Sequence, residues 1–149
     1  MTTVDEWAPY RTAHLGFGDP ECFSLSVDRR WTAEDLDGLR SLGLDGPFAV
    51  VTAHHPHERR LDAAENDRRH DALLAEVRRL RLHSVPCRGR SPDGSHREEG
   101  VAIACSLSIA VSIARRFEQS AIYWWDGSSL WIEPVISTRS PERLPRSPR

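Results

Sequence analysis

Lysine is absent from the chain, so all 20 of its basic residues are arginine. The missing lysine excludes Schiff-base chemistry and a phosphate-loop lysine. Acidic residues number 22, and the formal net charge of -2 provides no broad positive field for nucleic acid or anionic lipid. The composition therefore argues against a nucleic-acid partner and against a membrane partner.

Cysteine is also scarce, at three residues that are far apart and form no Cys-x-x-Cys pair. Neither a disulfide framework nor a cysteine zinc site is predicted. No stretch approaches the run of about 20 apolar residues that spans a membrane, and the first residues are acidic, unlike a signal peptide. We therefore expect a soluble, cytoplasmic protein.

Periodicity predicts alternating helices and strands in the first half of the chain. The expected elements are a short helix in residues 4–15, a strand in 22–27, a helix in 32–41, a strand in 48–53 and a helix in 62–80. The strand at 48–53 is almost continuously apolar, which is typical of a strand covered on both faces.

The second half contains one long alternating run, which we divide at Ser106 because strands average about five to six residues. The expected elements are strands at 85–90 and from 97, a helix at 107–118, a hairpin of 121–125 with 130–135, and a flexible tail from 137. This order predicts a single α+β domain in residues 1–136, with a disordered Arg/Pro/Ser tail at 137–149. Its core, 48–135, should be a mixed β-sheet with a split β-α-β (ferredoxin-like) arrangement and an added C-terminal hairpin strand; residues 1–47 should be a helical N-terminal extension.

The strand at 48–53 leads into the polar elbow His54-His55-Pro56-His57. On the following helix, Asn66 and His70 extend an otherwise apolar stripe towards this elbow. The elbow is therefore the candidate binding site.

Histidine and carboxylate residues near the elbow could supply metal ligands, and they include His54, His55, His57, Asp62, His70 and His96. No His-Glu-x-x-His motif fixes two of them on one helical face. We therefore expect no cofactor and less than one metal ion per purified chain, with His54, His57 and Asp62 as the weak metal candidates. No complete catalytic set is present, so the sequence leaves open whether the protein is an enzyme.

Four segments resemble an uncharacterised bacterial family, the domain-of-unknown-function family 3293. The segments are Thr52-Ala53-His54-His55-Pro56, Glu65-Asn66, Glu98, and Phe117-Glu118-Gln119-Ser120-Ala121-Ile122. The family pattern is Thr-Ala-x-Asn-Pro, Glu-Asn, a lone strand glutamate and Phe-Gly-Gln-x-Ala-Ile, so His55 replaces an asparagine and Glu118 a glycine. The resemblance implies one domain of a cytosolic bacterial protein and names no activity. It favours Glu98 as a site residue, whereas strand alternation favours its neighbour Glu99.

The leading hypothesis is a small ligand-binding or regulatory domain with a polar cleft at the end of the 48–53 strand. Its candidate lining residues are Thr52, His54, His55, Asn66, His70, Glu98 and Gln119. Alternatively, these polar groups only fix the turn. Two further hypotheses are a metal-assisted hydrolase that uses the elbow histidines with Glu98 as a base, and a protein-interaction module that uses the tryptophan hairpin or the arginine tail. The sequence specifies neither the small molecule or protein partner nor the oligomeric state.

Overall fold

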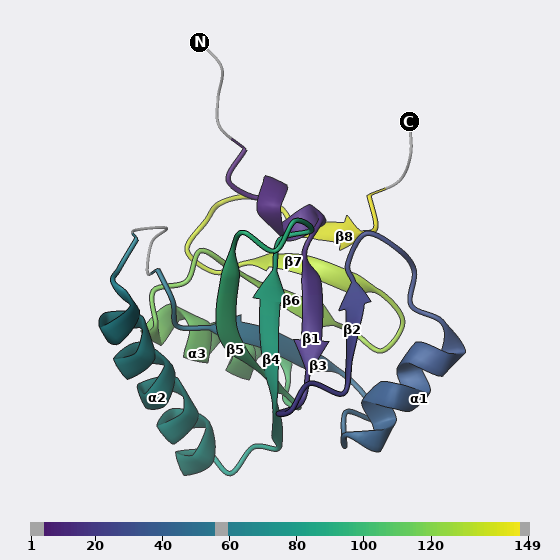
Figure 1. Cartoon of the computed structure of the whole chain (residues 1–149), viewed down its shortest axis with the longest axis horizontal. Coiled ribbons are helices and arrows are strands. Elements are labelled where there is room, and N and C mark those ends of the chain that lie inside the picture. Colours follow the sequence, from purple (N-terminus) through teal and green to yellow (C-terminus); the bar gives the residue numbers. More distant parts are fainter. Residues whose placement is uncertain (1–4, 56–59, 147–149) are drawn as a thin grey trace.

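The computed structural model describes residues 5–55 and 60–146 (Figure 1). The first elements are the 3-10 helix η1 (Ala8–Arg11), β1 (His14–Phe17), β2 (Phe23–Ser26), α1 (Ala33–Ser41), β3 (Phe48–Thr52) and α2 (Ala63–Arg79). The remaining elements are β4 (Ser84–Arg90), β5 (Arg97–Ile103), α3 (Leu107–Arg116), β6 (Ala121–Trp125), β7 (Leu130–Pro134) and β8 (Glu142–Leu144).

All eight of these strands form one strongly curled sheet in the order β2-β1-β4-β5-β3-β6-β7-β8 (Figure 1). Every strand pair in the described part of the chain is antiparallel. The α+β class is confirmed, but the expected mixed sheet is wrong. The finer ferredoxin-like comparison stays a prediction.

The sheet buries apolar side chains on both faces, and β3 shows why. Phe48 and Val50 contribute to the core that α1 covers, whereas Ala49 and Val51 contribute to the core beneath α2 and α3. Side chains alternate along a strand, so a strand between two cores has to be apolar throughout, as the sequence predicted. Figure 1 shows α2 and α3 together at one side and α1 at the other.

The three helices begin at side-chain caps. Thr32 and Asp35 form the expected capping box, and Asp62 accepts a hydrogen bond from the Glu65 backbone. Ser106 caps α3, which confirms the division of the long alternating run at this residue. No helix in the described ranges is long and apolar enough to cross a membrane.

Both ends of the chain differ from expectation. The strand expected in residues 22–27 is confirmed as β2, but apart from it the N-terminal extension is not only helical, because it also contains β1, which pairs with β2 and with β4. The tail was expected to be disordered from residue 137, yet it contains β8, which pairs with β7. The guanidinium of Arg139 lies 4.1 Å from the centre of the Trp7 ring. Residues 147–149 lie outside the described ranges.

Candidate functional site

The site forms where β3 ends and the chain turns through His54 and His55, which we call the β3 elbow. The hydroxyl of Thr52 accepts a hydrogen bond from the His54 backbone N–H at 3.1 Å and donates one to the Glu99 carbonyl at 3.1 Å. Thr52 therefore joins the elbow to the neighbouring strand β5. His55 adopts a left-handed backbone conformation with φ of 48°.

Two buried amide side chains form hydrogen bonds with the backbone of the β3 elbow. Asn66 on α2 accepts from the His55 N–H at 3.1 Å and donates to the Leu61 carbonyl at 3.3 Å. Gln119, after α3, donates to the carbonyls of His54 at 3.0 Å and Phe117 at 3.1 Å. The hydrogen-bonding groups that the sequence assigned to a ligand are therefore engaged with the protein backbone, as buried polar groups require.

Arg69 is a site residue that the sequence analysis did not single out. Its Nε donates to the Ala53 carbonyl at 2.8 Å and its Nη2 to the Phe117 carbonyl at 2.5 Å. Glu65 pairs with Arg68. Arg69 lies three residues after Asn66, so its place on the same helical face was the available signal.

The elbow histidines meet a carboxylate from β5. One possible ligand atom from each of His54, His55 and Glu98 lies within 4.8 Å of the other two; we call these three residues the elbow cluster. The strand register explains this contact. Thr52 pairs with Gly100 in the antiparallel ladder, and Glu98 lies two residues before Gly100, towards the elbow. Its neighbour Glu99 instead forms ion pairs with Arg88 and Arg97.

Two buried imidazole nitrogens, His54 Nε2 and His70 Nδ1, have no hydrogen-bond partner in the described part of the chain. The two rings are nearly perpendicular, with centres 6.2 Å apart. Burial lowers the pKa of His54, and the nearby His70 and His55 imidazoles lower it further. His54 is therefore held in the neutral form that can ligate a metal.

His55 makes a specific contact of its own. Its Nδ1 lies 3.2 Å from the Leu61 backbone nitrogen and accepts that N–H. In neutral His55 this hydrogen bond assigns the ring proton to Nε2. A metal on His55 therefore has to compete with the Leu61 hydrogen bond or replace it.

The remaining predicted metal ligands are not part of the elbow cluster. Asp62 caps α2 through its carboxylate, and His96 is an exposed residue of the turn before β5. His57 lies outside the described residues. The seven candidate lining residues do gather at the elbow, where Thr52, Asn66 and Gln119 hold the backbone and the other four are three imidazoles and one carboxylate.

The fold and site together define an antiparallel α+β protein with a histidine-carboxylate cluster at the end of a central strand. Residues 51–122 match the family described as "Protein of unknown function (DUF3293)", which confirms the resemblance inferred from the sequence. No curated protein and no solved structure matches the chain.

Proposed function

We propose that the protein is a small-ligand-binding domain whose ligand is one divalent transition-metal ion, held by the elbow cluster. The observation that carries this proposal is the convergence of two imidazoles and one carboxylate within 4.8 Å. Two histidines and one acidic residue form a recurrent ligand set for zinc and for non-haem iron. One of the three donors, His54, is 8% exposed and has an unpartnered Nε2.

The ligand atoms of the elbow cluster have to move closer together to hold a metal ion, and we expect side-chain rotation to supply this movement. Ligand atoms around a tetrahedral zinc ion are about 3.3 Å apart, given zinc–nitrogen distances of roughly 2.0–2.1 Å. The largest separation in the elbow cluster, at most 4.8 Å, has to shorten by about 1.5 Å. We expect rotation of the half-buried His55 and Glu98 side chains to supply a movement of this size while the backbone remains clamped.

The hydrogen bond from Leu61 to His55 opposes metal binding only weakly. Breaking one such bond costs about 1 kcal/mol, whereas structural zinc sites bind with about 10–16 kcal/mol. The free energy of metal binding is therefore much larger than the cost of losing this hydrogen bond. Because the pKa of His54 is lowered by burial, its imidazole stays available for a metal at a lower pH than an exposed imidazole does.

A cleft for an amide-bearing or nucleotide-like molecule has less support. Such a ligand needs hydrogen-bonding groups that face it, and Thr52, Asn66 and Gln119 direct theirs to the elbow backbone. The elbow cluster itself presents imidazole and carboxylate groups. A metal ion fits these groups better than an amide or a nucleotide does.

The test compares two adjacent carboxylates, Glu98→Gln and Glu99→Gln, because only Glu98 belongs to the elbow cluster. Metal-free protein is titrated with Zn²⁺ by calorimetry, and metal content is measured after dialysis. We expect one zinc ion per chain in the wild type and in Glu99→Gln, and at least about 100-fold weaker binding in Glu98→Gln, which loses one of three ligands. Free zinc at 100 times the Kd should stabilise the wild type by about 2.7 kcal/mol.

Two results would contradict the proposal: no stoichiometric zinc in the wild type, or equal affinities in the two variants. Glutamine is nearly isosteric with glutamate, so Glu98→Gln removes the charge with little change of shape. Tagless protein has to be used, because a histidine tag binds zinc itself.

A further inference from the structure

We propose that the hollow between α2 and α3 is a docking groove for an acidic amphipathic helix of a partner protein. The two helices lie together at one side of the sheet (Figure 1). The hollow between them has a volume of about 290 Å³ and is lined by residues from 76–80 and from 108–116; we call it the α2–α3 groove. This proposal is independent of the metal site at the β3 elbow.

The α2–α3 groove presents apolar side chains to solvent. Leu80 and Ile109 line it and are 37% and 40% exposed, and the buried Ile113 lies beside them in the lining. Only three large apolar side chains are exposed in the described part of the chain, and the third, Ile136, does not line the groove. Exposed apolar side chains that gather in one hollow indicate a contact surface, whereas isolated ones do not.

The lining residues on α3 form a regular helical stripe. They are Ser108, Ile109, Ser112, Ile113 and Arg116, which make two neighbouring rows with a spacing of four residues. From Ser108 to Arg116 the stripe is about 12 Å long at 1.5 Å per residue, which corresponds to roughly two turns of a partner helix. The two small serines allow a close approach, so the ridge of a third helix fits between these rows and α2.

The accessible charge of the α2–α3 groove is positive. The side chains of Arg79 and Arg116 are 63% and 60% exposed, whereas Glu76, the single acidic residue of the lining, is 14% exposed. Both guanidinium groups donate to the Glu76 carboxylate. Each guanidinium has five N–H donors and uses at most two of them in this contact. Both arginines can therefore bind a further carboxylate, which favours an acidic partner.

An amphipathic helix with carboxylates beside its apolar stripe combines the two properties that the groove requires. Its apolar residues at i, i+3 or i+4 and i+7 contact Leu80 and Ile109. Its flanking carboxylates reach Arg79 and Arg116. Six of the eight lining residues are exposed, so the groove is too shallow to enclose a small molecule, which buries about 70–90% of its surface when bound. A second copy of this chain would present the same positive rim, which like-charge repulsion disfavours.

The experiment measures the binding of two labelled amphipathic peptides of about 15 residues to the full chain by fluorescence anisotropy. Both peptides have leucine at every third or fourth position, and they differ in having either glutamate or lysine at the flanking positions. We expect the wild type to bind the glutamate peptide at least about 10-fold more tightly than the lysine peptide, and salt to weaken this binding. In Arg79→Gln/Arg116→Gln this preference should be lost.

Single variants test the apolar contact. Leu80→Gln and Ile109→Gln should each bind the glutamate peptide about 10-fold more weakly or worse, because each removes an apolar side chain that the peptide covers. Ile136→Gln is the matched control, since Ile136 is 44% exposed outside the groove, and it should bind as the wild type does. Circular dichroism should show that the peptide gains helix when it binds.

Several results would overturn the proposal. They are no binding of the glutamate peptide to the wild type, equal binding of the two peptides, or an equal loss in Ile136→Gln and Leu80→Gln. A wild-type dimer in sedimentation equilibrium that Ile109→Gln dissociates would also overturn it, because the groove would then be an interface between copies of this chain. Thermal unfolding checks that the variants are folded. Should Leu80→Gln or Ile109→Gln fail to fold, the comparison of the two peptides on the wild type still decides, since it needs no variant.

Discussion

Glu118 has a left-handed backbone conformation with φ of 59°, directly after the C-cap of α3. The turn is a Schellman motif, in which Gln119 N–H donates to the Ala114 carbonyl and Glu118 N–H to the Arg115 carbonyl. Glycine is the usual residue at this position because a Cβ atom is disfavoured there. Glu118 is therefore a strained residue directly before Gln119.

We predict that Glu118→Gly stabilises the protein by about 1 kcal/mol, because it removes a left-handed penalty of roughly 1–2 kcal/mol, whereas the 3.6 Å ion pair with Arg69 that it loses is solvent-exposed on the Glu118 side. Urea unfolding measures the change. Arg81→Gly is the matched control, since Arg81 follows the C-cap of α2 with φ of 57°. A destabilised Glu118→Gly beside a stabilised Arg81→Gly would show that the Glu118 side chain is needed at the elbow.

His55 also lies at a left-handed position, with φ of 48°. Asparagine and histidine are both tolerated there more readily than most residues. The same backbone thus accommodates either residue, but only histidine adds an imidazole to the elbow cluster. His55 is thus one of the two imidazoles of the elbow cluster.

At the scale of elements, one side chain joins β3, α2 and α3. Arg69 on α2 binds the carbonyl of Ala53 after β3 and the carbonyl of Phe117 at the end of α3. A planar guanidinium can donate in two directions at once, which a lysine ammonium cannot do with the same geometry. The positions of the elbow and of the α3 terminus therefore depend on the same residue.

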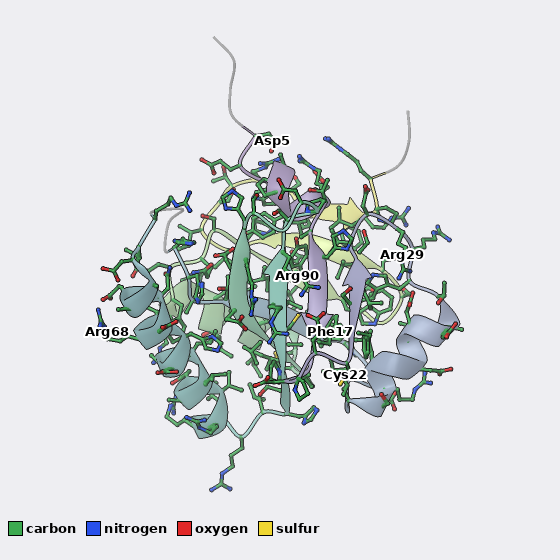
Figure 2. All side chains as sticks on the ribbon, viewed as in Figure 1. Asp5, Phe17, Cys22, Arg29, Arg68 and Arg90 are labelled. Carbon is green, nitrogen blue, oxygen red and sulfur yellow. The ribbon has the colours of Figure 1, made fainter. Side chains whose placement is uncertain are left out.

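We predict that Arg69→Met destabilises the protein by about 3 kcal/mol, since two hydrogen bonds from a charged donor are lost and each contributes roughly 1.5–3 kcal/mol. The adjacent Arg68→Met should cost only a few tenths of a kcal/mol, because Arg68 makes an exposed helical ion pair with Glu65 and points away from the sheet (Figure 2). Urea unfolding of both variants checks the difference. Equal losses would show that Arg69 does not clamp the elbow.

Local sequence patterns predicted most elements, and long-range pairing explains those they missed. Caps at Thr32, Asp62 and Ser106 fixed the helix starts, because a cap bonds only nearby backbone. The strands β1 and β8 have four and three residues, too few for a periodic signal. Each depends on a partner strand distant in sequence.

The same distinction holds for the site. Sequence placed His54 and His55 at a strand end, but alternation favoured Glu99 because it shares a face with Val101 and Ile103. The register of β5 against β3 decides otherwise, and a register is set by pairing across 48 residues, from Thr52 to Gly100. For Arg69 the sequence offers only its place on the same helical face as Asn66, because its partners are backbone carbonyls that no side-chain motif identifies.

At the scale of the whole molecule, the two ends of the described chain lie together (Figure 1). Arg11 is buried between Asp5 and Glu142, and it donates to the Glu142 carboxylate through Nε at 2.5 Å and Nη2 at 2.9 Å. Figure 2 shows Asp5 at this end. Arg11 therefore connects η1 to β8, the edge strand at one end of the sheet.

This arrangement is sensitive to acid. The Arg11 guanidinium lowers the pKa of Glu142, and with the Trp7 N–H it lowers the pKa of Asp5 to about 2. A carboxylate with a lowered folded-state pKa contributes stability above its unfolded pKa, near 4.3 for glutamate. That contribution is lost as the pH falls through the folded-state pKa.

We predict that Glu142→Gln lowers the free energy of unfolding by about 2 kcal/mol at pH 7. The buried Arg11 then loses a charged carboxylate that accepts two of its hydrogen bonds. As the pH falls below the unfolded-state value near 4.3 and through the lowered folded-state pKa, the wild type loses this contribution, so the difference between the two proteins should shrink. Urea unfolding at pH 7 and pH 3 measures both values, with Asp71→Asn, at an exposed position on α2, as the control. A difference that is equal at the two pH values would mean that β8 is held by the packing of Leu144, which is 4% exposed, rather than by the Arg11 ion pair.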